Sequence, residues 1–143
     1  MVQSPRVFKA ARPHDGPRDS APSLQVFKAG KLAFSSEEAG LKPLAHLFFT
    51  KPSLLRGSSV YDKVVGEAAA RIFILAKVAK VHAGTASKRA LERLHHAGIL
   101  VMAAREVEII CNAKHSAMCP MEKLSGEHAE DKKFVEALKK KFA

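Results

Sequence analysis

Residues 63–79 constrain the fold more than any other part of the sequence. They predict a helix that is apolar on almost every side, with one polar stripe formed by Lys63, Glu67 and Arg71. Because a helix of this kind must be buried, we expect it to pack against a sheet. Asp62, a residue type that caps helices well, stands directly before the helix and is predicted as its N-cap.

Short strand-like runs alternate with helical patterns on both sides of this stretch. Residues 24–28 and 31–35 flank Ala29-Gly30, which is typical of a hairpin because glycine readily adopts a positive φ at the turn. The pattern also predicts strands at 58–61, 80–83 and 99–103, a loop at 84–87, and helices at 41–49, 87–97 and 130–142. This order predicts an α/β fold with a mixed sheet in a three-layer α/β/α arrangement.

Length and composition limit the classes of protein. The 143 residues are typical of one domain, and a hydrophobic content of 47% is enough to build a core. We expect a flexible, proline-rich extension over residues 1–22 and a single domain over 23–143. We also expect a cytoplasmic protein without membrane contact, since the sequence has no apolar run of membrane-spanning length and no secretory signal. Two cysteines do not form a disulfide scaffold.

The chain is strongly basic. Its 24 Lys and Arg residues against 14 Asp and Glu residues give a formal charge of +10 at neutral pH. Such a surface suits nucleic acid or an anionic ligand, although a solvated surface with a basic tail explains it equally well. Only 6% of the residues are aromatic, so the stacking platform of a single-strand binder is missing. Nucleic-acid binding through the basic surface is therefore an alternative function, not the leading one.

Two predicted helix starts carry the candidate site residues. At Asp62-Lys63-Val64-Val65-Gly66, free backbone N–H groups suit an anion, Lys63 adds charge, and Gly66 allows close approach. A plain capping and packing role explains the same residues. At Cys119-Pro120 the thiol stands at the positive end of a short predicted helix, which makes Cys119 a candidate nucleophile. A buried structural cysteine is the alternative there.

The residues around Cys119 also include ligands that zinc prefers. Cys111, His115 and Cys119 have the right ligand chemistry and would share one face of a helix. Zinc sites usually pair cysteines two to four residues apart and add a fourth ligand, and neither feature is evident. We therefore expect no bound metal.

The segments D-K-V-V-G-E-A-A-A at 62–70 and C-P-M-E-K at 119–123 together resemble a small, mostly prokaryotic family of unknown function. That family is assigned to the cytidine deaminase-like fold. The resemblance spans roughly residues 24–124 and implies a five-stranded mixed sheet with helices on both faces.

The resemblance also bears on zinc chemistry. In zinc deaminases of this fold, one helix starts with H-x-E and a second with P-C-x-x-C. The corresponding positions here hold Asp62 for the histidine, Val64 for the catalytic glutamate, and Glu122 for the second cysteine. Because valine cannot transfer a proton, the resemblance implies a pocket between the two helix starts without deaminase activity.

Two positions differ from the family pattern. Glu67 and Ala113 stand where basic residues are expected, so any phosphate contact of those residues is weakened or changed. Our leading hypothesis is a nucleotide-like ligand bound at the Asp62 and Cys119 helix starts, with contacts from Lys63, Gly66, Asn112 and Glu122. The alternatives are a basic nucleic-acid-binding module and an active metal-dependent deaminase with atypical ligands. Whether the protein is an enzyme stays open.

Overall fold

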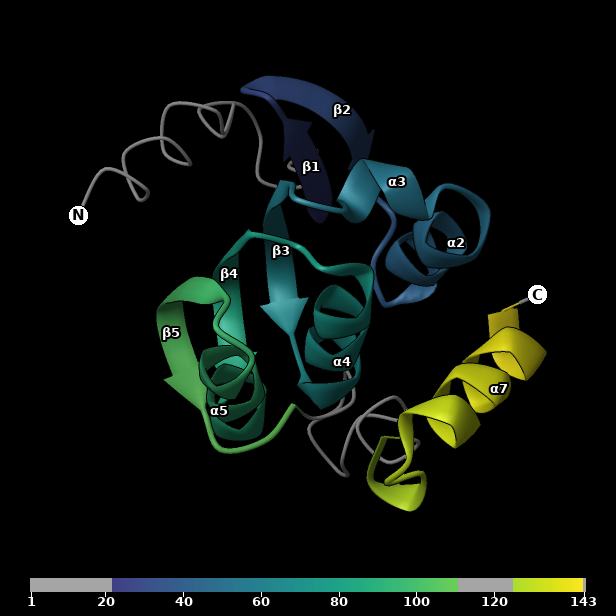
Figure 1. Ribbon diagram of the computed structural model, residues 1–143. Helices are drawn as coiled ribbons and strands as arrows, with labels where there is room; N and C mark the ends of the chain where they lie inside the picture. The colour runs from purple at the N-terminus through teal and green to yellow at the C-terminus, as the bar shows by residue number, and fades with distance from the viewer. Residues whose placement is uncertain (1–21, 111–124, 143) are drawn as a thin grey trace.

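The computed structural model describes residues 22–110 and 125–142. Its centre is a five-stranded sheet with the order β2-β1-β3-β4-β5 (Figure 1). The strands are β1 (Leu24–Lys28), β2 (Lys31–Ser36), β3 (Ser59–Val65), β4 (Lys80–Ser87) and β5 (Leu100–Val107). Strand β1 is antiparallel to β2 and β3, whereas β3, β4 and β5 are parallel to one another. The predicted α/β class with a mixed sheet is confirmed, and the arrangement is consistent with three layers.

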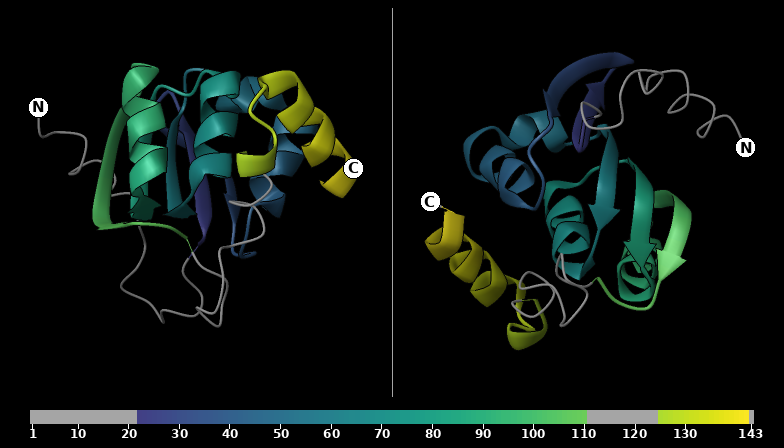
Figure 2. Two further views of the ribbon diagram at one scale, coloured as in Figure 1. Left: turned by 90° about the horizontal axis from the view of Figure 1, so that it is seen from below. Right: turned by 180° about the vertical axis from the view of Figure 1, so that it is seen from behind.

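The helices are α2 (Lys42–Thr50), α3 (Pro52–Leu55), α4 (Glu67–Ala76), α5 (Lys88–His96) and α7 (Asp131–Phe142). Helices α4 and α5 connect successive parallel strands and lie side by side against one face of the sheet (Figures 1 and 2). This placement follows from the right-handed crossover of parallel strands, because both crossovers run in the same direction along the sheet. Helices α2 and α3 pack against α4, and α7 packs against α2.

The predicted hairpin is confirmed. Strands β1 and β2 pair antiparallel with Lys28 opposite Lys31, so two residues form the turn. Ala29 has φ 52° and Gly30 has φ 79°. Two successive positive φ values match the right-handed twist of the flanking strands, and this explains the glycine at the second position.

The core lies between α4 and the sheet. Ala68, Ala70, Ile72 and Phe73 of α4 are at most 1% exposed. They belong to one buried cluster with Val26, Val60 and Val81, which are register neighbours on β1, β3 and β4. The expectation that this apolar stretch is buried against a sheet is therefore confirmed, and each large side chain contributes about 1.5–3 kcal/mol.

The predicted start of that helix is wrong. Strand β3 continues to Val65, and α4 begins only at Glu67 with Gly66 as its N-cap. Asp62 therefore lies inside a strand, opposite Leu24 on one side and Ala83 on the other, and caps no helix. The run of β-branched valines favours the strand, and the glycine that follows ends it.

The boundaries of two neighbouring elements also differ from the prediction. Helix α4 ends at Ala76 because Lys77 adopts the left-handed conformation, with φ 62°, as its C-cap. Residues 84–87, expected as a loop, extend β4 up to Ser87. In the described part of the chain, no helix is long and apolar enough to cross a membrane.

Candidate functional site

The first candidate site is the edge where the parallel strands end. Val65 of β3 pairs with Ala86 of β4, so both strands end side by side. Helix α4 starts directly after β3, and α5 starts directly after β4. The N-termini of the two helices therefore share one edge of the sheet, which we call the carboxyl edge. Open α/β sheets bind ligands at this position.

The two helix starts at the carboxyl edge are capped differently. Ser87 accepts a hydrogen bond from the backbone N–H of Ala90 at 3.1 Å and so caps α5. Gly66, the N-cap of α4, has no side chain that can accept one. The first turn of α4 is nevertheless buried, with Glu67 5% and Ala68 1% exposed. Because the helix dipole favours negative charge at an N-terminus, and the cap here has no side chain in the way, this helix start is suited to an anionic group.

Asp62 lies in the middle of β3, three residues before the strand ends at Val65. Burial raises the pKa of the Asp62 carboxyl well above its usual value, although hydrogen bonds from the backbone N–H groups of Val64 and Lys63 act in the opposite direction. A carboxyl group that is costly to ionise in the folded state is a candidate functional group.

The Asp62 carboxyl makes a testable contribution to stability. Asp62→Asn is expected to raise the free energy of unfolding at pH 7, because ionised Asp62 is disfavoured in the folded state and each unit of pKa shift corresponds to about 1.4 kcal/mol. The contribution of protonated Asp62 is fully present below the ordinary value of 3.8 and is lost as the pH rises through the raised pKa. The advantage of asparagine should therefore disappear in acid.

Urea denaturation of both proteins in acid, at about pH 3.5, and at about pH 7 measures this effect. Glu106→Gln, at an exposed carboxyl on β5, is the matched control. A difference between wild type and Asp62→Asn that does not change with pH would contradict the assignment.

Three of the residues that the sequence singled out lie in β3 and at the start of α4. Asp62 and Lys63 are neighbours within β3, and Gly66 is the N-cap of α4. The side chain of Lys63 is exposed, and its backbone N–H donates to the carbonyl of Ser23 at 2.8 Å. The other candidates, Cys119, Asn112 and Glu122, lie outside the described residues, as do Cys111 and His115. Their approach to the carboxyl edge stays a prediction.

Within residues 22–110 and 125–142, no three His, Cys, Asp or Glu side chains are grouped so as to hold a metal ion. The cysteines considered for zinc are not among these residues.

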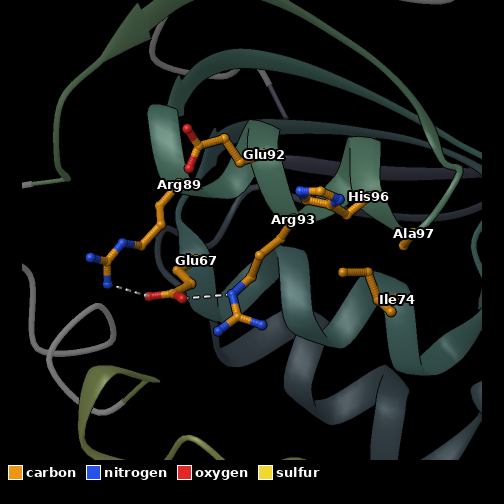
Figure 3. Close-up of a pocket in the computed structure, with 7 residues that line it drawn as sticks. All are labelled: Glu67, Ile74, Arg89, Glu92, Arg93, His96 and Ala97. Carbon is orange, nitrogen blue, oxygen red and sulfur yellow. Dashed lines mark hydrogen bonds and ion pairs between the residues drawn. The ribbon is translucent and has the colours of Figure 1, made fainter.

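A second candidate site lies between α4 and α5 (Figure 3). It is a pocket of about 550 Å³ lined by Glu67, Ile74, Arg89, Glu92, Arg93, His96 and Ala97. At one end, the Glu67 carboxylate extends from the first turn of α4 toward α5. Its Oε2 accepts a hydrogen bond from Nε of Arg93 at 2.6 Å, and Oε1 lies 3.7 Å from Nη1 of Arg89.

The sequence pattern alone does not indicate this pocket. It places Glu67 in a polar stripe and assigns no role to Arg89 or Arg93. The available signal was the spacing of two arginines four residues apart, which places both on one face of a helix. Their common partner, on another helix, is visible only in the folded chain.

These features belong to a protein of a defined family. Residues 19–142 match the family described as TM1506, domain of unknown function (DUF1893), and the chain belongs to that family. A crystal structure of a DUF1893 family protein, TM1506 from Thermotoga maritima, is similar to this chain with 29% sequence identity and a TM-score of 0.78. The similarity covers 98% of this chain and 88% of the other. No curated protein matches the sequence.

Proposed function

We propose that this protein binds a small phosphate-bearing, nucleotide-like ligand at the carboxyl edge of β3 and β4. The observation that carries the proposal is the start of α4, which is buried and has glycine as its N-cap. A phosphate group can accept hydrogen bonds from several N–H groups of such a turn at once, and the helix dipole favours its charge.

Two further residues support this placement. The exposed Lys63 stands three residues before the helix start and adds a positive charge at the same edge. Asp62, whose pKa is raised by burial, can donate a hydrogen bond in its protonated form to an acceptor on the ligand. Helix α5 adds to the positive potential, since Lys88 begins it and its first turn carries no acidic residue.

Native mass spectrometry of the full chain, before and after denaturation, is the first test, because a ligand that copurifies adds mass only in the native state. Equilibrium dialysis against AMP, CMP and inorganic phosphate then measures affinity. Lys63→Gln is expected to weaken binding about threefold, as removal of one exposed charge does. Lys31→Gln, at an exposed lysine beside the hairpin turn, should leave affinity unchanged.

Equal affinities of the Lys63→Gln and Lys31→Gln variants would contradict the proposed location. If none of the three compounds binds, the proposed function itself is contradicted. Cys119→Ala, measured in the same way, tests the hypothesis that this thiol acts on the ligand. The proposed cytidine deaminase-like fold draws support from the hairpin followed by parallel strands, and a deaminase reaction is not part of this proposal.

Nucleic-acid binding is a second candidate, favoured by one observation. Helix α7 exposes five lysines, which are Lys132, Lys133, Lys139, Lys140 and Lys141. Phosphate contacts of this kind make affinity fall steeply with salt concentration. Titration of a short RNA at low and high salt would support this candidate if binding falls steeply, and would exclude it if no salt-dependent binding occurs.

A further inference from the structure

We propose that the pocket between α4 and α5 is a separate binding site for a phosphomonoester with an apolar body, held by Arg89 and Arg93. The charged end of this pocket lies beside the carboxyl edge, but its ligand contacts are Arg89 and Arg93, and it does not depend on the ligand proposed there. The two arginines share one carboxylate, that of Glu67.

Glu67 positions Arg93. The side chain of Glu67 is 7% exposed, and its hydrogen bond to Nε of Arg93 is short, at 2.6 Å. A charge-assisted bond to a buried carboxylate fixes the guanidinium group in one orientation. The bond between Arg93 and Glu67 uses Nε (Figure 3), which leaves the two terminal nitrogens of Arg93 for other acceptors. They form a fork of the kind that matches two oxygens of a phosphate group.

Arg89 is held much less firmly than Arg93. Its Nη1 lies 3.7 Å from the nearer oxygen of Glu67, which is too long for a hydrogen bond, and its side chain is 70% exposed. Arg89 can therefore turn toward an incoming anion without breaking a hydrogen bond to Glu67. The two arginines stand one helical turn apart on α5, so a single phosphate group can contact both.

Among the described residues, the charges at this end of the pocket leave a positive surplus. One buried carboxylate stands opposite two guanidinium groups, and Lys88 precedes them in the first turn of α5. Glu92, the other acidic residue of the pocket, is exposed on α5 and points away from the Glu67 carboxylate in Figure 3. An anion with more than one charge is therefore favoured over a neutral ligand.

The remaining lining determines what else the ligand carries. Ile74 of α4 and Ala97, at the end of α5, provide apolar surface beyond the arginines. A volume of about 550 Å³ exceeds what a phosphate ion alone would fill. The pocket therefore suits a phosphate ester whose organic part packs on Ile74 and Ala97.

The test measures the affinity of the full chain for phenyl phosphate by calorimetric titration. Inorganic phosphate and benzoate are titrated for comparison. Phenyl phosphate is expected to bind more tightly than either compound, because it alone combines a dianion with an apolar ring. Arg89→Gln should weaken its binding about tenfold. Arg105→Gln, at an exposed arginine on β5, is the matched control and should have no effect.

Glu67→Gln gives the sharpest outcome. The amide oxygen still accepts the bond from Arg93, while a negative charge next to the bound phosphate disappears, so affinity should increase about threefold. Unchanged affinity in both Arg89→Gln and Glu67→Gln would overturn the proposal. If affinity falls in Lys63→Gln instead, the compound binds at the carboxyl edge, which overturns this inference and supports the proposed function.

Discussion

Replacing Arg71 with methionine is expected to lower the free energy of unfolding by about 3–5 kcal/mol, the cost of breaking a buried charged network. The Arg71 side chain is 1% exposed. Its guanidinium group donates hydrogen bonds of 3.0, 2.6 and 3.2 Å to the carbonyl oxygens of Ser125, His128 and Ala129. Methionine preserves the apolar stem but leaves these carbonyls without their donor.

The contacts of Arg71 extend into α7. Its Nη2 also donates to Oδ1 of Asp131 at 3.1 Å, and the guanidinium group lies 4.0 Å from the ring centroid of Phe134. The side chain of Asp131 is 59% exposed, so this ion pair alone contributes little. Arg71 therefore stabilises the attachment of α7 to α4 mainly through backbone carbonyls and the aromatic ring.

Urea denaturation followed by circular dichroism measures the loss. Asp131→Asn is the matched control, because it removes the exposed ion pair and should cost less than about 1 kcal/mol. If Arg71→Met loses no more than Asp131→Asn, the carbonyl contacts do not stabilise the fold. Should Arg71→Met fail to fold, Arg71→Lys, which preserves the charge without the fork, is expected to give an intermediate loss.

Gly84→Ala is expected to destabilise the protein by about 2–3 kcal/mol through overpacking between the central strands. A Cβ on Gly84 would stand 2.7 Å from the backbone carbonyl oxygen of Lys63 and 3.4 Å from the hydroxyl of Tyr61. The carbonyl belongs to β3, so the contact can be relieved only by moving one central strand relative to the other.

Thermal and urea denaturation of Gly84→Ala should show the loss directly. Gly126→Ala is a suitable control, since a Cβ there would meet nothing within 4 Å and the residue lies away from the sheet. A Gly84 variant as stable as the Gly126 variant would show that β3 and β4 can separate at low cost. In that case β3 and β4 can move apart near the carboxyl edge more easily than their close packing implies.

Local patterns were enough to predict most elements of this fold. The Ala29-Gly30 turn is specified by the conformation of its own two residues, and Ser87 and Gly98 mark the two ends of α5 with side-chain and backbone preferences that act over one turn. The alternation of strands and helices then predicts the sheet, because parallel strands need crossovers. No contact distant in sequence is required for any of these inferences.

The candidate site was harder to predict. Asp62 is a good N-cap by residue type, but whether it caps a helix depends on where β3 ends, and pairing with β1 and β4 decides that. The pairing of the valine-rich strand β3 with its neighbours therefore determines the conformation at Asp62, and the N-cap propensity of aspartate does not. The prediction that Gly66 allows a ligand to approach closely does not depend on this correction, because glycine is accepted at an N-cap as well as in a first turn. It stays a prediction.

The buried charges could not be predicted from the local pattern at all. Glu67 and Arg71 follow the spacing of a polar stripe, and such a stripe usually faces water. Here Glu67 meets arginines from α5, and Arg71 meets carbonyls more than 50 residues further along the chain. The sequence contains each partner, but only the packing of α4 between two other parts of the fold brings them together.

Arg71 also determines which changes the C-terminal part of the chain can tolerate. Most of its hydrogen bonds reach main-chain oxygens, which every amino acid provides. Substitutions at His128 or Ala129 therefore leave these acceptors in place, whereas an inserted or deleted residue would rotate the carbonyls away from the guanidinium group. In this segment the protein constrains the length of its chain more strictly than the identity of its side chains.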